Sequence, residues 1–312
     1  MSGSRWIGPA CAVLGVGGFS FKAILAKLVY QDPSVDVPTL LALRMLYAAP
    51  FFTAMAWYGS RRANAHPIVR ADALRLVWFG FIGYYLSSLL DFSGLRYISA
   101  SLERLVLYLY PTMVVLLSAF LLKEPITRRA MVALALSYAG IVVAFAHDLR
   151  FGANVHDTLL GGMLVFASSA LYALYLVQAG SVIGRIGSMR FIAWAMLTSA
   201  VFVLVQFLVV NPLEALAVSP RVHALSLTMA VVSTVLPTWL IAESVRRIGA
   251  NEASLIGALG PVITMGLGVV ILGEPFELVQ LAGAALVLCG VLLVTLRPSR
   301  AAVTADAGTG AR

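Results

Sequence analysis

Five ionisable side chains lie inside otherwise apolar stretches of the sequence, and they are the first candidates for chemistry. They are Lys22, Arg44, Asp91, Glu103 and Arg104. A charge buried among apolar groups is costly unless an opposite charge or a ligand compensates it. The five could form an inward-facing network that contacts or gates a substrate, or internal ion pairs that only fix helix packing. Arg44 and Arg104 are the candidate ion-pair partners of Glu103.

Lys22 is the strongest individual candidate for substrate binding. It shares one helical face with Gly18, Gly15 and Cys11, and small residues let a second helix approach closely. That face is therefore predicted to look into the protein, where Lys22 could bind a carboxylate. The alternative is that its ammonium group reaches the outer polar interface. Asp91 is the matching candidate for an ammonium group.

Polar side chains also recur at helical spacing in three apolar segments. The sets are Tyr84, Ser88 and Asp91; Ser168, Tyr172 and Tyr175; and Thr234 and Thr238 with the neighbouring Trp239. Such stripes indicate either the wall of a polar cavity or a tight contact between helices. We expect them to line a cavity.

The composition shows what must position these residues. The 312-residue chain is 61% hydrophobic and 12% charged, with a mean hydropathy of +0.93. A soluble domain is about 45–50% apolar and about 25% charged, so an all-α integral membrane protein is predicted. Its net charge of +8 is scattered between apolar runs, which favours a topology signal over nucleic-acid binding.

Ten segments are long and apolar enough to span a bilayer. They are Trp6–Tyr30, Pro38–Tyr58, Ala73–Ser93, Ala100–Leu122, Arg129–His147, Leu159–Ser181, Arg190–Val210, His223–Glu243, Glu252–Leu272 and Glu277–Leu296. Most Lys and Arg residues between them fall on one side if the N-terminus is cytoplasmic. The positive-inside rule then places both termini in the cytoplasm.

The segment Leu95–Ala144 recurs at Val245–Val294, displaced by 150 positions without a gap. Pro111 falls on Pro261, the pair Glu124-Pro125 on Glu274-Pro275, and Gly140 on Gly290. We therefore expect two five-helix repeats, at 6–147 and 159–296, followed by a cytoplasmic tail at 297–312 that is predicted to be disordered. An odd number of spans per repeat inverts the second copy, as in many secondary transporters.

These residues carry a resemblance to a known family. The run Leu95-Arg96-Tyr97-Ile98-Ser99-Ala100-Ser101 leads to Pro111 and Glu124, and Ile248-Gly249-Ala250-Asn251 leads to Pro261 and Glu274; the run Phe19-Ser20-Phe21-Lys22 also fits. The pattern resembles the ten-helix, EamA-like exporters of the drug/metabolite transporter superfamily. The resemblance implies export of amino acids, other metabolites or drugs. It also implies a central cavity lined by helices 1, 3, 4, 6, 8 and 9, with helices 5 and 10 at the periphery. Glu103-Arg104 departs from the small neutral residues usual there.

The two copies differ before their shared proline. The first has Leu107, Tyr108 and Tyr110 where the second has Gly257, Ala258 and Gly260. We expect the bulk of helix 4 to face the space left by helix 9, which would shape an aromatic-walled pocket. Pro111 and Pro261 each remove a backbone hydrogen bond and are predicted to kink their helices.

The combined reading is a secondary transporter in the bacterial inner (cytoplasmic) membrane. It would export small amphipathic metabolites, above all amino acids including aromatic and apolar ones, by alternating access. The sequence contains no Walker A, HExxH or GxSxG motif and no metal-spaced Cys/His cluster. We therefore expect no enzymatic activity, cofactor or metal, and no nucleic-acid partner. The expected partners are the substrate and membrane lipid, with the chain acting as a monomer or weak homodimer.

Three alternatives stay open: a flippase for lipids or lipid-linked sugars, a multidrug carrier, and more remotely an intramembrane enzyme or scaffold. The driving force is open as well. Proton antiport needs a carboxylate that titrates in the path, for which Asp91, Glu243 and Glu252 are candidates, whereas facilitated diffusion needs none.

Overall fold

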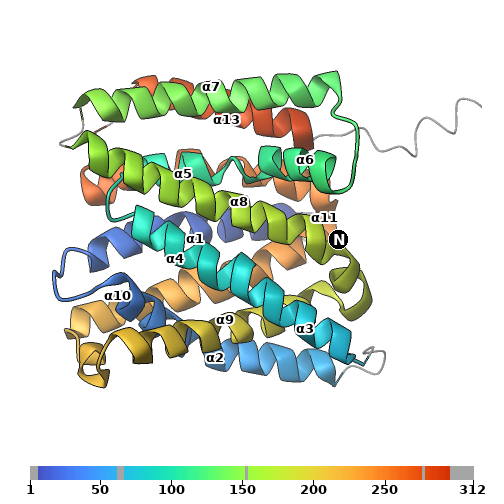
Figure 1. Ribbon diagram of the computed structural model, residues 1–312, viewed down its shortest axis with the longest axis vertical. Coiled ribbons are helices and arrows are strands. Elements are labelled where there is room, and N and C mark those ends of the chain that lie inside the picture. The colour runs from blue at the N-terminus through green and yellow to red at the C-terminus, as the bar shows by residue number, and fades with distance from the viewer. Residues whose placement is uncertain (1–5, 62–66, 152–153, 276–277, 296–312) are drawn as a thin grey trace, which may run out of the picture.

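The computed structural model describes residues 6–61, 67–151, 154–275 and 278–295, and within them all regular structure is helical (Figure 1). The α-helices are α1 (Ile7–Val29), α2 (Val37–Ser60), α3 (Arg70–Phe79), α4 (Ser87–Gly94), α5 (Ala100–Leu107), α6 (Tyr110–Leu121), α7 (Arg128–Phe151), α8 (Val155–Ile186), α9 (Ser188–Val210), α10 (Pro220–Ala230), α11 (Leu236–Gly257), α12 (Gly260–Leu267) and α13 (Leu278–Thr295). Short η segments, η1 (Gly80–Leu86), η2 (Leu213–Leu216), η3 (Val231–Val235) and η4 (Gly268–Leu272), complete the order.

Several of these helices join end to end into single spans. Ten spans are long and apolar enough to cross a membrane: Ile7–Val29, Val37–Ser60, Arg70–Gly94, Ala100–Leu121, Arg128–Ala146, Val155–Ile186, Ser188–Val210, Pro220–Gly249, Glu252–Leu272 and Leu278–Thr295. We number these spans 1 to 10. The predicted ten-helix fold class is thus confirmed, whereas the predicted tail at 297–312 lies outside the described residues.

Spans 6 and 8 extend beyond their predicted bounds of 159–181 and 223–243 at both ends. Span 6 passes through Gly180 and Gly184 and ends only at Ile186. The residue that follows, Gly187, has φ of 83°, and Gly249 at the end of span 8 has φ of 85°. A positive φ is readily adopted only by glycine, so these two positions set the true boundaries.

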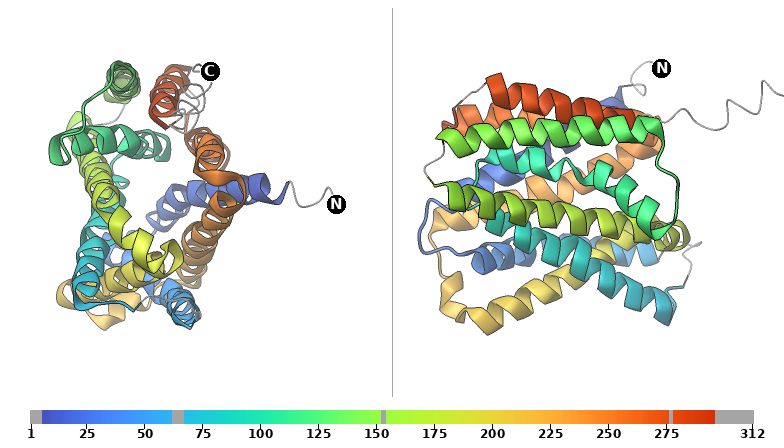
Figure 2. Two further views of the ribbon diagram at one scale, coloured as in Figure 1. Left: turned by 90° about the vertical axis from the view of Figure 1, so that its right-hand side faces the viewer. Right: turned by 45° about the horizontal axis from the view of Figure 1, so that its top comes forward.

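The packing partners reveal a twofold relation between the halves. The pair α7 and α13 (spans 5 and 10) and the pair α2 and α9 (spans 2 and 7) each join a helix to its own counterpart. The contact of α4 with α8 (spans 3 and 6) is mirrored by that of α11 with α1 (spans 8 and 1). Figure 2 shows α7 beside α13 at one edge of the bundle. These are the pairings that an inverted repeat requires.

Local helix irregularities also occur at equivalent positions. The π-helical turns η1 in span 3 and η3 in span 8 coincide when the sequence is shifted by the repeat length. In span 4 the helix is interrupted between Leu107 and Tyr110, and in span 9 between Gly257 and Gly260. In both spans a proline, Pro111 or Pro261, occupies the first turn after the interruption. A proline there lacks the N–H that a continuous helix would use.

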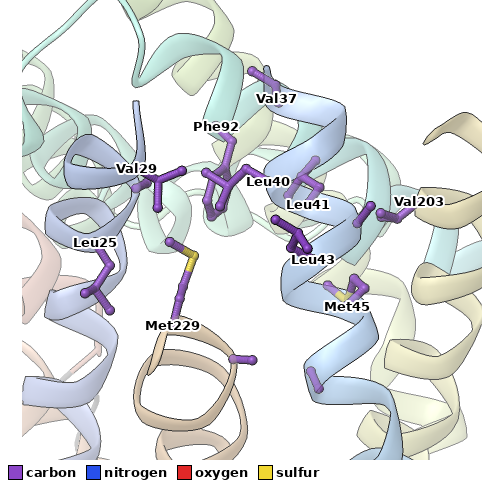
Figure 3. Packing of buried hydrophobic residues seen from close by; sticks show 14 of the residues in the cluster. Leu25, Val29, Val37, Leu40, Leu41, Leu43, Met45, Phe92, Val203 and Met229 are labelled. Atoms are coloured by element: carbon purple, nitrogen blue, oxygen red, sulfur yellow. The ribbon is translucent and has the colours of Figure 1, made fainter. Parts of the chain in front are cut away.

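The largest hydrophobic cluster fills one end of the bundle and extends past the middle at Phe52 and Met196. We call the end at which α1 begins the N-terminal end, and the end at which α1 finishes the distal end. Figure 3 shows Leu25 and Val29 of α1, Leu40 of α2, Phe92 of α4 and Met229 of α10 packed together. All belong to the distal halves of their spans, so apolar packing seals the distal end.

Candidate functional site

A cavity of about 940 Å³ runs along the inside of the bundle. Residues at the N-terminal end form its mouth, among them Pro125, Thr127, Ser188, Val245 and Thr295. Its deepest lining residues are Lys22, Arg44, Asp91 and Arg104. Among the described residues, none of the distal loops contributes to the lining. The cavity is therefore open at the N-terminal end and closed at the distal end by charged groups backed by the apolar cluster.

Lys22 holds two carboxylates at the floor of this cavity. Its Nζ lies 2.5 Å from Asp91 Oδ2 of α4 and 3.0 Å from Glu103 Oε1 of α5. Glu103 is 0% exposed and Asp91 3% exposed. One ammonium group bonded to two buried carboxylates ties three spans together, because neither carboxylate has solvent to stabilise its charge.

The two arginines at the floor lack ion-pair partners in the described part of the chain. Arg44 of α2 donates from Nε to Thr234 Oγ1 at 3.1 Å, and its guanidinium lies over the Phe92 ring at 5.2 Å. Its Nη1 is buried and has no hydrogen-bond partner among the described residues, and the same holds for Nε of Arg104. The guanidinium of Arg104 lies 5.6 Å from the centre of the Tyr108 ring. Arginine donors are thus available next to the cavity.

Tyrosines form one wall of the cavity. The Tyr84 and Tyr175 hydroxyls are 3.0 Å apart, joining span 3 to span 6. Tyr110 of span 4 meets Tyr172 edge-to-face with ring centres 5.4 Å apart. A Cβ atom at Gly83 would lie 2.6 Å from Cγ of Tyr175, so the missing side chain makes room for that ring. The wall offers both ring faces and hydroxyl groups to the cavity.

The structure brings most of the predicted site residues to this cavity. Those that line it are Lys22, Arg44, Tyr84, Ser88, Asp91, Arg104, Tyr110, Pro111, Tyr172, Thr234 and Thr238. Tyr175 is buried behind the wall, where it supports Tyr84. Trp239 does not line the cavity and its side chain is 46% exposed on the outside of the bundle. It follows Thr238 by one residue, and one helical step turns a side chain by about 100°.

The predicted pairing of Glu103 with Arg44 or Arg104 is wrong. Glu103 pairs with Lys22 instead. Arg104 is the next residue on the same helix, so its side chain leaves the helix in a different direction. Lys22 does point inward, because Gly15 and Gly18 on its face pack against Ile241 and Pro237 of α11.

Spans 4 and 9 meet as their composition suggested, and the contact is made by Tyr108. The Tyr108 hydroxyl donates to the Gly257 carbonyl oxygen, and a Cβ atom at Gly260 would lie 3.3 Å from that hydroxyl. Tyr110 instead faces Tyr172 of span 6. The bulk of span 4 therefore fills the space beside span 9 and also builds the aromatic wall.

Spans beyond the six implied by the resemblance also contribute. Arg44 of span 2 and Ile192 and Met196 of span 7 line the chamber, and Ala130 of span 5 and Val291 of span 10 reach its mouth. Spans 5 and 10 are otherwise peripheral, since α7 and α13 pack mainly on each other.

The sequence marked Glu274 only as part of the repeat, but the structure gives it a packing role. Glu274 accepts hydrogen bonds from Ala100 N–H at 2.7 Å, Ser101 N–H at 3.3 Å and Ser101 Oγ–H at 2.7 Å. It thereby caps the N-terminus of α5 from a distant part of the chain. The signal in the sequence was the Glu-Pro pair that recurs in both repeats.

The comparisons with known proteins agree with this architecture. The model of the EamA-like transporter family matches residues 6–146 and 159–296. The chain belongs to this family. EamA-like relatives include the uncharacterized transporter YcbK of Bacillus subtilis (strain 168), which is 30% identical over 87% of each chain. An uncharacterized transporter of Archaeoglobus fulgidus is 25% identical over 93% of this chain and 98% of the relative.

A solved crystal structure has a similar fold, with a TM-score of 0.61, 20% identity, and coverage of 95% of this chain and 97% of that one. At this identity the likeness concerns the fold alone. Family, relatives and spans together make this protein a multi-pass membrane transporter of the drug/metabolite type.

Proposed function

We propose that this transporter exports small amphipathic metabolites, above all amino acids including aromatic and apolar ones, across the bacterial cytoplasmic membrane. One observation carries the proposal: cationic and anionic side chains face the same blind-ended chamber, beside a wall of tyrosines. A free amino acid presents a carboxylate, an ammonium group and a side chain together. The chamber offers a complement to each, including cation–π and stacking contacts at the tyrosines.

The shape of the chamber supports a small solute. Its volume of about 940 Å³ lies in the range of about 300–1,000 Å³ usual for small-molecule sites. A blind-ended cavity between two inverted repeats is the geometry from which alternating access proceeds. With the termini in the cytoplasm, as the distribution of basic residues favours, the mouth faces the cytoplasm and is ready to load a metabolite for export.

The same geometry narrows the candidates for proton coupling. Glu243 is held by Arg246 and Arg247, with its Oε1 2.6 Å from Arg247 Nε, and it does not line the cavity. Glu252 is exposed and is also absent from the lining. Asp91 is the carboxylate of the three that faces the chamber, so any proton antiport is proposed to pass through it.

Uptake of a radiolabelled amino-acid panel into proteoliposomes tests the proposal. We expect counterflow of aromatic and apolar amino acids, inhibited by their unlabelled forms. Flux of lipids or of lipophilic cations, without competition by amino acids, would replace the proposal by a flippase or a multidrug carrier. The same assay with and without a pH gradient separates antiport from facilitated diffusion, since only antiport is accelerated by the gradient.

A further inference from the structure

The charges at the cavity floor do not cancel. Lys22 is already paired with Asp91 and Glu103, and with both carboxylates ionised this set carries one excess negative charge. Arg44 and Arg104 add two positive charges, which leaves the floor at +1. A net charge in a site shielded from bulk water is costly, and a bound anion relieves that cost.

The available hydrogen-bond donors belong to the arginines rather than to Lys22. Arg44 is 7% exposed, lines the chamber, and leaves Nη1 without a hydrogen-bond partner in the described chain. Arg104 lines the same chamber, and its Nε has no hydrogen-bond partner within the described ranges. Guanidinium groups match the planar, two-oxygen geometry of a carboxylate.

Three buried carboxylate oxygens of the network, Glu103 Oε1 and Oε2 and Asp91 Oδ1, have no hydrogen-bond partner among the described residues, and of these two residues Asp91 lines the chamber. Asp91 uses Oδ2 to bind Lys22, whereas its Oδ1 is buried and has no partner among the described residues. We propose that Arg44 and Arg104 form the subsite for the substrate's carboxylate, that Asp91 Oδ1 accepts from its ammonium group, and that Lys22 only positions Asp91. This assignment rests on the proposed function and specifies an α-amino acid.

Three probes separate the groups: phenylalanine, 3-phenylpropionate without the ammonium group, and phenethylamine without the carboxylate. Their binding to purified protein is measured for the wild type, Arg44→Gln, Arg104→Gln and the control Arg96→Gln. Arg96 is exposed, stacks on Tyr30 and does not line the cavity. Loss of a charge-assisted pair should weaken phenylalanine and phenylpropionate about 10- to 100-fold, with phenethylamine and the control unchanged.

Each outcome decides between the assignments. Equal losses for all three probes, or no loss in either arginine variant, overturn the carboxylate subsite while the proposed function stands. If the wild type binds none of the probes, both the proposed function and the subsite are wrong. Two controls detect misfolding. Arg44→Lys keeps the positive charge and should lose less affinity for phenylalanine than Arg44→Gln. Retained binding of phenethylamine shows that the site of a variant is folded.

A different observation carries a second inference, which concerns the repeated Glu-Pro pair. Glu274 caps α5 and so joins the end of span 9 to the start of span 4 at the closed distal end. The repeat equates Glu274 with Glu124, and the capped positions 100 and 101 with 250 and 251. Glu124 is exposed at the cavity mouth and makes no hydrogen bond or ion pair within the described chain.

The turns leading to the two glutamates are alike, but the helices before them differ. Lys123 and Gly273 both have positive φ, at 57° and 69°. The residues before Gly273 form the π-helical η4, and the Glu274 N–H bonds to the Gly268 carbonyl at 3.1 Å. The equivalent end of α6 is α-helical. We infer that Glu124 is the counterpart latch, which caps the start of span 9 when the mouth closes and the distal end opens.

The latch is tested with one cysteine at Ser88, which lines the cavity, in a chain carrying Cys11→Ala and Cys289→Ala. Glu274→Gln should raise labelling from the distal side by a membrane-impermeant thiol reagent about tenfold. Adding Glu124→Gln should reverse that rise, whereas the exposed control Glu252→Gln should not. No rise with Glu274→Gln, or a rise that Glu124→Gln leaves unchanged, overturns the inference.

Discussion

Replacing Lys22 by methionine tests the ion network at the cavity floor most directly. The change keeps the length and apolar stem of the side chain but removes the ammonium group that lies 2.5 Å from Asp91 and 3.0 Å from Glu103. Removing one partner of a buried ion pair leaves an uncompensated charge and costs about 3–5 kcal/mol. At about 2 °C per kcal/mol for a chain of this size, the melting temperature should fall by roughly 6–10 °C.

The assay is thermal unfolding of detergent-purified protein, followed by intrinsic fluorescence. Lys22→Met/Asp91→Asn should melt above Lys22→Met, because removing a second charge relieves the unpaired carboxylate. Arg221→Gln is the control, since Arg221 is exposed and, within the described part of the chain, bonds only Gln31. If Lys22→Met melts with the wild type, or if the double variant shows the sum of both single losses, the network does not stabilise the bundle as described.

Three further predictions follow from particular contacts. Gly140→Ala should destabilise the protein by about 1–3 kcal/mol, because the added Cβ atom would lie 2.5 Å from the Gly283 carbonyl oxygen. Thermal unfolding measures this loss. An unchanged melting temperature would show that α7 and α13 can separate freely. Tyr110→Ala should enlarge the chamber beside Tyr172 and shift counterflow towards bulkier amino acids; an unchanged substrate range in a folded variant refutes the aromatic wall. Partial burial works against ionisation of Asp36, but hydrogen bonds from Thr39 and Asn211 outweigh it and lower its pKa. The stability that this carboxylate adds is therefore complete above its ordinary pKa and is lost as the pH falls through the lowered pKa. The difference in melting temperature between the wild type and Asp36→Ala should shrink below about pH 4. A difference that grows on acidification contradicts the assignment.

The fold could be predicted because its signals are local or repeated. Apolar length defined the spans, and the ungapped register of Pro111 on Pro261 indicated the duplication. Span ends were less certain, because a glycine ends a helix only where the backbone takes a positive φ, as at Gly187 but not at Gly180 or Gly184.

The site was predictable as a set of residues but not as a set of pairs. Helical spacing grouped Tyr84, Ser88 and Asp91 on one face, and that face lines the chamber. Which cation meets Glu103 depends on how spans 1 and 4 are rotated against each other, and sequence spacing within one helix says nothing about that rotation. For the same reason the hydrogen bond from Arg44 to Thr234 could not be foreseen.

The contact between Gly140 and Gly283 has a consequence for any measurement of motion. A Cβ atom at Gly283 would lie 2.7 Å from the Gly140 carbonyl oxygen, and one at Gly140 would crowd Gly283 in turn. This contact joins α7 to α13, its counterpart in the other repeat. If the two repeats exchange conformations during transport, the α7–α13 contact is therefore converted into itself. Probes attached to α7 and α13 along this contact should keep their separation throughout the transport cycle. Their distance would serve as a fixed reference for measuring the movements of the other spans.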